Sequence, residues 1–179
     1  MVSTADSAKI RLGVPVYRDA QHVICVCENA VLTYSSDAPN PHYLAAWTQT
    51  VEFVLAQFHA GLLVLTVIDR NAHAPDDASK TSIRNTIVQH AGQIDAFAYV
   101  VDGEGFRAAA MRSALSLIAL AARYPFPQKV FGRVEDAVPW MLRRPYHGEQ
   151  GPRQAPAAAK LIKMANSLRG ELKSVAAAG

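Results

Sequence analysis

The chain alternates between short apolar runs and longer segments in which apolar residues recur every three or four positions. The first pattern is typical of strands and the second of helices with one buried face. Two apolar runs, at 14–17 and 23–27, flank a polar Arg-Asp-Ala-Gln sequence and predict a β-hairpin. In the second run Val23, Cys25 and Cys27 share a face that we assign to the core, whereas His22 begins the strand and is expected in solvent.

The next segment predicts a helix over residues 41–60 that packs on a sheet. Asn40 can cap its first turn, Pro41 suits its first position, and Gly61 stands just past its end. Its apolar residues fall on one stripe: Leu44, Trp47, Val51, Val54, Leu55 and Phe58. The continuously apolar run at 62–69 that follows predicts a central strand covered on both faces.

The second half of the pattern repeats helix and strand. We expect a polar-faced helix over 75–89 with Asp76 and Asp77 in its first turn, a helix that ends at residue 122, and a final domain helix over 133–144. Between them lie predicted strands at 94–101 and 129–131. The middle helix is expected to bury Met111, Ala114, Leu115, Ile118 and Ala122. Pro139 should kink or restart the final helix.

The glycines at 103 and 105 follow a strand and open a helix, as the glycines of a nucleotide-binding turn do. A dinucleotide fingerprint requires a third glycine, and a phosphate loop requires Lys-Ser/Thr; this turn has neither. The sequence therefore predicts a turn that only reverses the chain, and we expect no cofactor.

Residues 145–158 are rich in Pro, Gly and Gln and predict a linker, and residues 159–176 predict an amphipathic basic helix. Its stripe contains Leu161, Met164, Leu168 and Leu172. Gly170 weakens the helix by about 1 kcal/mol relative to alanine, so the helix needs a surface on which to lie. That surface is the parent domain or a second copy, another protein, or an anionic membrane.

The 179 residues are half apolar, enough for one core, so we expect a flexible start at 1–10 and one domain at 11–144. The net charge of +3 lies in the tail, because seven Lys/Arg and two acids follow Leu142. The rest is slightly acidic, which argues against binding to nucleic acid. With no apolar run of about 18 residues and no secretory pattern at the start, we expect no membrane insertion and a cytoplasmic location.

The best candidate for chemistry is the loop after the central strand, which holds Asp69, Arg70, His73, Asp76 and Asp77. One histidine with several carboxylates has the ligands that a divalent ion needs. The sequence lacks His-Glu-x-x-His and Gly-x-Ser-x-Gly, however, and no second histidine follows at helical spacing. Cys25 and Cys27, which are separated by one residue, suit neither a disulfide nor a zinc site. We therefore expect no metal and no catalytic residue.

From Val14 to Leu142 the order of predicted elements resembles the STAS superfamily, the fold of sulphate transporters and anti-sigma-factor antagonists. The segment at 96–141, AFAYVVDGEGFRAAAMRSALSLIALAARYPFPQKVFGRVEDAVPWM, is similar to the ending of SpoIIAA-like single-domain bacterial proteins. The resemblance implies an α/β fold, a mixed sheet with flanking helices, to which the C-terminal amphipathic helix is added. It also implies action by docking on partner proteins rather than by turnover.

In the anti-sigma-factor antagonists that the chain resembles, a kinase phosphorylates a hydroxyl within an Asp-Ser-Ser-Gly-like sequence. The matching residues here are Asp77, Ala78, Ser79 and Lys80, so alanine stands at the acceptor position and lysine at the glycine. Ser79 is then a shifted candidate acceptor, with Thr81 and Ser82 nearby.

The sequence thus predicts a non-catalytic interaction module in regulation or signalling, with an unidentified protein partner. The surface expected to bind that partner consists of Arg70, His73, Asp76, Asp77, Ser79, Ser82, Glu104 and Arg107. The stripe of the tail helix would mediate self-association into a dimer or capture a partner. The alternative is a small-molecule or lipid-binding domain, which requires a cavity between the helices at 41–60 and 105–123.

Overall fold

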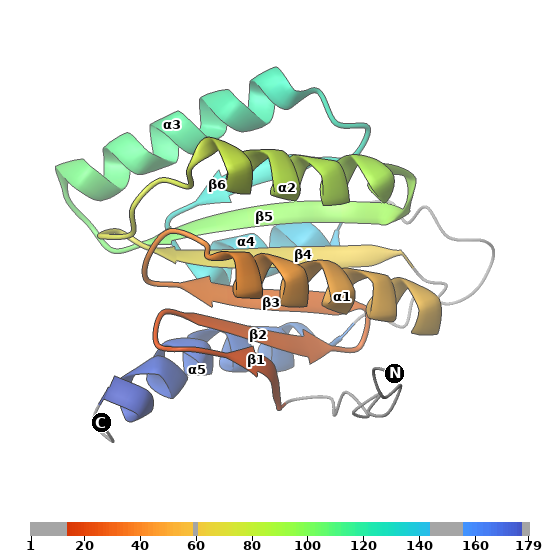
Figure 1. Cartoon of the computed structure of the whole chain (residues 1–179), viewed down its shortest axis with the longest axis horizontal. Helices are drawn as coiled ribbons and strands as arrows, with labels where there is room; N and C mark the ends of the chain where they lie inside the picture. Colours follow the sequence, from red (N-terminus) through yellow and green to blue (C-terminus); the bar gives the residue numbers. More distant parts are fainter. Residues whose placement is uncertain (1–13, 59–60, 144–155, 177–179) are drawn as a thin grey trace, which may run out of the picture.

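The computed structural model describes residues 14–58, 61–143 and 156–176. Its centre is one six-stranded mixed sheet in which the spatial order of the strands follows the chain (Figure 1). The first three strands form an antiparallel meander, and the third to sixth strands run parallel. The strands are β1 Pro15–Arg18, β2 His22–Cys27, β3 Ala30–Ser35, β4 Leu62–Asp69, β5 Ile94–Asp102 and β6 Gln128–Phe131.

Helices cover both faces of the sheet and create two apolar layers. One face carries α1 Pro41–Gln57, α2 Asp77–Gln89 and α3 Phe106–Ala122, and the other carries α4 Val134–Leu142 and α5 Ala158–Ala176 (Figure 1). A short 3-10 turn, Ala91–Gln93, leads into β5. Side chains of α1 and α2 belong to one buried cluster and those of α4 and α5 to the other. The α/β class and the mixed sheet are therefore as predicted.

Strand β3 is absent from the sequence prediction. It follows β2 after a two-residue turn in which Glu28 takes a positive φ of 55°, and it pairs antiparallel with β2 and parallel with β4. Its β-branched and aromatic residues, Val31, Thr33 and Tyr34, are typical of a strand and could have predicted it. The strand joins the predicted hairpin to the parallel part of the sheet.

Strand β2 is buried on both faces rather than on one. Val23, Cys25 and Cys27 face the core, as expected, and there they pack in the cluster of α4 and α5; both cysteines are free and buried. Ile24 and Val26 on the opposite face belong to the α1 layer. The prediction of one core face failed because α1 also covers β2, and the local pattern does not show that these two segments meet.

His22 is fully buried, so the expectation that it lies in solvent is wrong. Its Nδ1 lies 3.0 Å from Asp19 Oδ1, and its Nε2 lies 3.1 Å from the Ala38 carbonyl oxygen. Tyr17 and Asn40 donate to Asp19 Oδ2 at 2.8 Å each. Burial raises the pKa of Asp19, but hydrogen bonds from the Gln21 amide, Asn40 and Tyr17 outweigh it and hold that pKa well below its usual range. The network therefore fixes the entry of β2.

The start of α1 agrees with the prediction, but the helix ends at Gln57 rather than at residue 60, so Gly61 does not directly follow it. The start of α2 also differs slightly. Asn40 caps α1 by accepting from the Tyr43 amide at 2.9 Å. Asp76 is the cap of α2, which begins at Asp77 instead of at Pro75. α4 continues through Pro139 to Leu142, so the expected restart does not occur.

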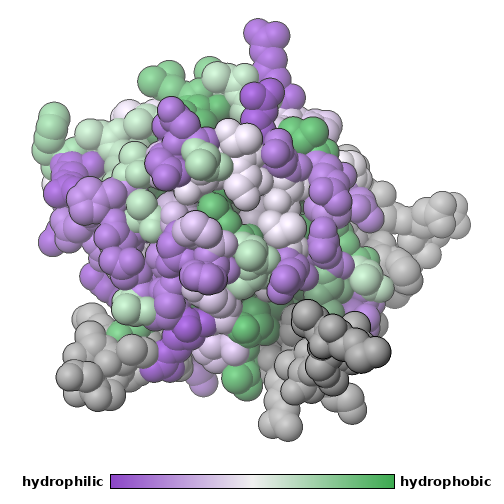
Figure 2. Space-filling view, in the orientation of Figure 1, coloured by the Kyte–Doolittle hydropathy of each residue, from purple (hydrophilic) through white to green (hydrophobic). Residues whose placement is uncertain are grey.

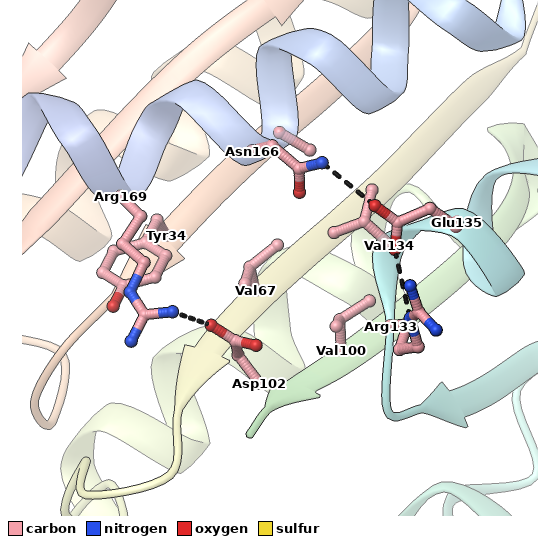
Figure 3. A pocket seen from close by; sticks show the side chains of 10 residues that line it. Tyr34, Val67, Val100, Asp102, Arg133, Val134, Glu135, Asn166 and Arg169 are labelled. Atoms are coloured by element: carbon pink, nitrogen blue, oxygen red, sulfur yellow. Dashed lines mark hydrogen bonds and ion pairs between the residues drawn. The ribbon is translucent and has the colours of Figure 1, made fainter. Parts of the chain in front are cut away.

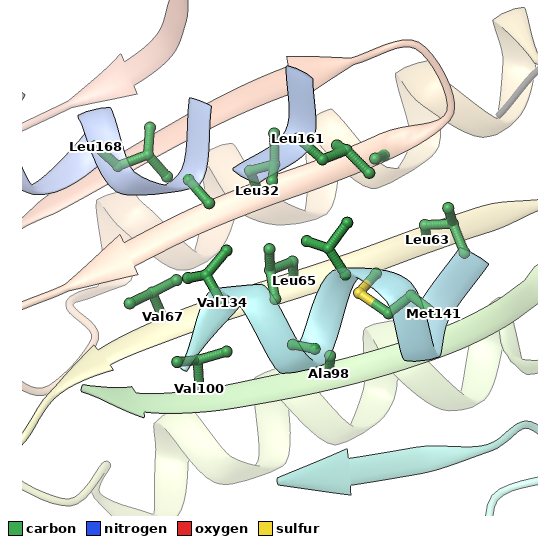
Figure 4. Packing of buried hydrophobic residues seen from close by; sticks show 14 of the residues in the cluster. Leu32, Leu63, Leu65, Val67, Ala98, Val100, Val134, Met141, Leu161 and Leu168 are labelled. Carbon is green, nitrogen blue, oxygen red and sulfur yellow. The ribbon is translucent and has the colours of Figure 1, made fainter. Parts of the chain in front are cut away.

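Helix α5 packs on the sheet of its own chain beside α4 (Figure 4). Leu161, Leu168 and Leu172 are buried in the cluster that α4 and the sheet form, and Met164 packs against that cluster half-buried. Lys160 pairs with Glu28 at 2.9 Å. This packing corrects the expected self-association stripe, because its leucines have no free surface for a partner. Most of the predicted linker lies outside the described residues, and the helix starts at Ala158 rather than at residue 159.

Helix α3 contacts β5 and β6 but is largely uncovered. Ala108 is its only buried residue, and of the five side chains expected to be buried, Ala114, Ile118 and Ala122 are exposed. Figure 2 shows green and pale green side chains along the upper left edge of the molecule, where Figure 1 places α3. The helix is apolar on nearly every side, so its pattern did not identify the side that faces the sheet.

Candidate functional site

The parallel strands place two carboxylates at one edge of the sheet. Asp69 and Asp102 are the last residues of β4 and β5, and they are partners in the strand register. In α/β folds, ligands bind at the carboxyl ends of the strands, so this edge is the natural place for a site.

Arg169 of α5 bridges the two strand ends. Its Nη1 lies 2.6 Å from Asp102 Oδ2 (Figure 3). Its Nη2 lies 3.9 Å from Asp69 Oδ2. Tyr34 at the end of β3 donates to Asp69 Oδ2 at 3.1 Å. Burial, the charge of Asp69 and this hydrogen bond raise the pKa of Tyr34 to about 12, so its hydroxyl stays protonated at neutral pH.

Beside this bridge lies an open pocket of about 320 Å³ between the start of α4 and the middle of α5. Its apolar lining is Val67, Val100, Val134 and Ala165, and its polar lining adds Arg133, Glu135 and Asn166 to the groups above (Figure 3). Asn166 donates to Glu135 Oε1 at 3.1 Å, and Arg133 Nε lies 3.6 Å from Glu135 Oε2. The hydrogen bond from Asn166 is the main cause that lowers the pKa of Glu135.

Both arginines of the pocket are engaged with carboxylates of the same chain. A ligand would therefore meet paired charges and an apolar floor, which suits a small polar molecule better than a bare anion. Among the described residues, no group of three or more His, Cys, Asp or Glu side chains is arranged to hold a metal ion.

The sequence-predicted surface lies at the same sheet edge, on the loops after β4 and β5. Arg70 Nη1 donates to the Glu104 carbonyl at 3.5 Å, and Arg107 Nη2 donates to the Asn71 carbonyl at 3.3 Å. Gly103 has a φ of +101°, and a Cβ there would lie 2.9 Å from Arg70 Cδ. The structure therefore brings Arg70, Glu104 and Arg107 together, and glycine permits this approach.

His73 joins a different partner. Its Nδ1 lies 2.6 Å from Asp37 Oδ1, in the loop after β3. Hydrogen bonds from the His73 ring, from the Ala38 amide and from the His73 amide lower the pKa of Asp37 to about 2. His73 is exposed and Asp37 is half-buried, and the pair connects the loop after β3 to the loop after β4.

The polar residues at the start of α2 cap the helix or pair within it. Asp76 Oδ1 accepts from the Ser79 amide at 2.7 Å, and Asp77 pairs with Lys80 at 2.8 Å. The side chain of Ser79 is buried, and its Oγ donates to the Pro39 carbonyl at 3.3 Å. Ser82 is half-buried one turn further on. The candidate phosphoacceptor hydroxyl is thus covered in this structure.

Sequence reasoning missed the pocket because its polar residues come from segments far apart in the chain. Asp102 was visible as an acid that ends a strand, and it is 67 residues from Arg169. No local pattern marks Tyr34 or Asn166 as a neighbour of Arg133 and Glu135, since these three segments meet only when α5 docks.

The arrangement of a mixed sheet between two helix layers places the chain in a known α/β class, and a solved structure identifies that class. No family model and no curated protein matches the sequence. The chain is similar in structure to an uncharacterized protein of the DUF3478 family from Shewanella loihica PV-4, described as having a SpoIIAA-like fold. The TM-score is 0.50 at 14% identity, over 68% of this chain and 93% of that one. The chain therefore contains a domain of SpoIIAA-like, STAS-like fold.

None of the helices in the described part of the chain has the length and apolarity to span a bilayer.

Proposed function

We propose that this chain is a non-catalytic docking module that regulates a protein partner through its loop edge, defined as residues 70–82 and 103–107. The support is geometric. The two loops contact each other through Arg70 with the Glu104 carbonyl and through Arg107 with the Asn71 carbonyl, so their exposed charged groups lie on one surface. A preorganised surface loses less entropy on binding than mobile loops do.

The observation that carries this proposal is the exposure of both arginines together with exposed acids nearby. Arg70, Arg107, Glu104, Asp76 and Asp77 are all exposed at this edge. A mixed pattern of charges favours selection of a complementary partner more than it favours raw affinity. The surface is thus suited to a specific contact.

The test is affinity capture with the tagged full-length chain, compared by quantitative mass spectrometry with the double variant Arg70→Glu/Arg107→Glu. The matched control is Lys163→Glu, an exposed charge reversal on α5. We expect proteins captured by the wild type and the control to be lost from the double variant. An unchanged set of captured proteins would contradict the role of the loop edge.

Phosphorylation at Ser79 remains a proposal that requires the first turn of α2 to open, because the Oγ is covered and bonded to the Pro39 carbonyl. A phosphate there would add nearly two negative charges beside Asp76 and Asp77. The test is incubation of the chain with ATP and a kinase that co-purifies in the affinity capture, followed by mass-spectrometric mapping of the phosphorylated residues. Modification at Thr81 or Ser82 but not at Ser79 would exclude Ser79 as the acceptor.

A second candidate function is binding of a small polar molecule in the pocket beside Arg169. It is favoured by the 320 Å³ volume and by the mixed lining. The pocket lies on the α4 and α5 side, whereas on the other face α2 separates the two helices between which a cavity was expected (Figure 1). Native mass spectrometry should detect a bound ligand in the wild type. The ligand should be absent from the variant Asn166→Trp, because the larger side chain would fill the opening of the pocket. A protein mass without any adduct would count against this function.

A further inference from the structure

Helix α3 presents an apolar face to solvent along its whole length. Phe106, Leu117 and Leu120 are 89%, 68% and 77% exposed, and Ile118 is 62% exposed. The hydroxyls of Ser113 and Ser116 donate to the carbonyls of Ala109 and Arg112, at 3.0 and 2.7 Å, so neither hydroxyl proton is left for water. A helix that is apolar on all sides is normally covered in a working protein.

Charge is nearly absent from this helix. Its only charged residues are Arg107 in the first turn and Arg112. Arg112 turns back to the sheet edge, where its Nη1 donates to the carbonyls of Val101 and Gly103 at 3.3 and 3.1 Å. The centre of the exposed face is therefore uncharged, and the stripe of α5 cannot cover it, since that stripe is already buried on the opposite face of the sheet.

The exposed face has the spacing of a helix-pairing seam. Phe106, Ala110, Ser113, Leu117 and Leu120 follow one another at steps of four, three, four and three residues. This is the 3.5-residue repeat of helices that pack side by side. The seam lies opposite Ala108, the one buried residue of the helix.

We infer that the occupant of this face is α3 of a second copy of the chain, antiparallel and related by a two-fold axis at Ser113. The seam is self-complementary in that arrangement, as an isologous interface must be. Leu117 of one copy would lie over Ala109 and Ala110 of the other, so that large side chains meet small ones. Phe106 would meet Leu120.

The charges at the two ends of the helix support the same arrangement. Glu104, just before α3, lies nine residues from Ser113, and Arg123, just after α3, lies ten residues from it on the other side. An antiparallel pair therefore places each glutamate beside the arginine of the other copy, and a parallel pair would place like charges together. A lipid surface requires neither the 3.5-residue spacing nor the small central residues, so a second copy accounts for more of the pattern.

The expected affinity follows from the size of the contact. Seventeen helical residues extend about 25 Å, and one helix per copy buries less than a standard interface. We therefore expect a reversible dimer that forms over the micromolar range. This inference goes beyond the docking role of the loop edge and does not depend on it.

The first test is the mass of the full-length chain by light scattering or sedimentation equilibrium across a micromolar concentration series. We expect the mass to rise toward twice the 19.4 kDa of one chain. Leu117→Lys places a cation against the apolar face of the other copy and should keep the protein monomeric. Val88→Lys is the matched control, because Val88 is 56% exposed on α2, outside the seam, and should leave the dimer unchanged.

The second test fixes the geometry through engineered cysteines. Ser113→Cys should form a disulfide between copies under mild oxidation, because residue 113 of each copy lies at the two-fold axis. Ala121→Cys lies on the same exposed face but away from the axis, so it should not cross-link. Native Cys25 and Cys27 are buried and should not interfere.

Each outcome decides the inference. A chain that is monomeric at every concentration, or a dimer that persists in Leu117→Lys, would overturn it. Cross-linking of both cysteine variants would exclude the antiparallel arrangement. The loop edge shares Phe106 with the seam, but Arg70 and Arg107, the two residues changed in the capture test, are not seam residues. Loss of partner capture with an intact dimer therefore contradicts neither this inference nor the docking proposal.

Discussion

Replacing Leu168 by alanine tests whether α5 belongs to the cooperative core. Leu168 is buried among the side chains that α5, α4 and the sheet contribute to one cluster (Figure 4). Leucine-to-alanine changes at such sites cost roughly 3 to 5 kcal/mol, because the lost burial is joined by a cavity. α5 packs on the sheet from one side only, so the surroundings of Leu168 can relax partly and we expect a cost near the lower end of this range, about 3 kcal/mol.

The assay is urea unfolding followed at each of the two tryptophans separately. Trp140 lies in the cluster on the α4 and α5 side, and Trp47 lies in the cluster on the α1 side. Single-tryptophan variants, Trp47→Phe and Trp140→Phe, therefore report the two layers independently. If the domain unfolds as one unit, Leu168→Ala should shift both transitions equally. At this chain length the loss corresponds to a fall in Tm of roughly 6 to 12 °C.

Lys163→Ala is the control on the exposed side of the same helix and should stay within about 0.5 kcal/mol of the wild type. The reasoning would be refuted if Leu168→Ala were as mild as this control. It would also be refuted in part if only the Trp140 transition moved, because α5 would then form a separate unfolding unit.

Three further outcomes follow from charges. Asp19→Asn should lower the free energy of unfolding at neutral pH, and the loss should shrink progressively below about pH 4. The reason is that a carboxyl with a lowered folded-state pKa stabilises the fold above its usual pKa and loses that contribution as the pH falls. Urea unfolding that gives the same loss at neutral pH and below pH 4 would contradict this. His73→Ala should raise the pKa of Asp37 from about 2 toward its usual value. If NMR titration of the Asp37 carboxyl carbon gives the same pKa in the variant, the His73–Asp37 pair is not the cause of the low pKa. Arg169→Gln should cost about 1 kcal/mol in low salt and less in high salt, since the strand-end aspartates lose their bridge; a salt-independent loss would point to packing instead.

Local patterns predicted most of the secondary structure because the signals are local. The Asn40 cap, the stripe of α1 and the continuous apolar run of β4 each depend on neighbours in sequence, and all three are confirmed. The start of α2 differed by two residues, because Asp76 acts as a cap instead of entering the helix.

The candidate pocket could not be predicted in the same way, since no local pattern reports which distant segments meet. Arg169 closes on Asp102 and Lys160 on Glu28 across 67 and 132 residues. These contacts exist because α5 docks on the sheet, and the sequence left the sheet as one of several surfaces on which it was expected to lie. His22 was placed wrongly for a related reason: its partner Ala38 follows β3, a strand that the sequence pattern had not revealed.

The contrast between α3 and α5 shows what an apolar pattern does and does not determine. α5 has a narrow apolar stripe among charged residues, and its own sheet covers that stripe. α3 has more apolar surface, but it lies over β5 and the edge strand β6, where the sheet offers only one side of contact. Periodicity therefore shows how much of a helix should be covered, and the topology shows how much the chain itself can cover. For α3, the apolar surface that should be covered exceeds the surface that its own chain can cover, and that excess is the physical reason to look for its partner outside the chain.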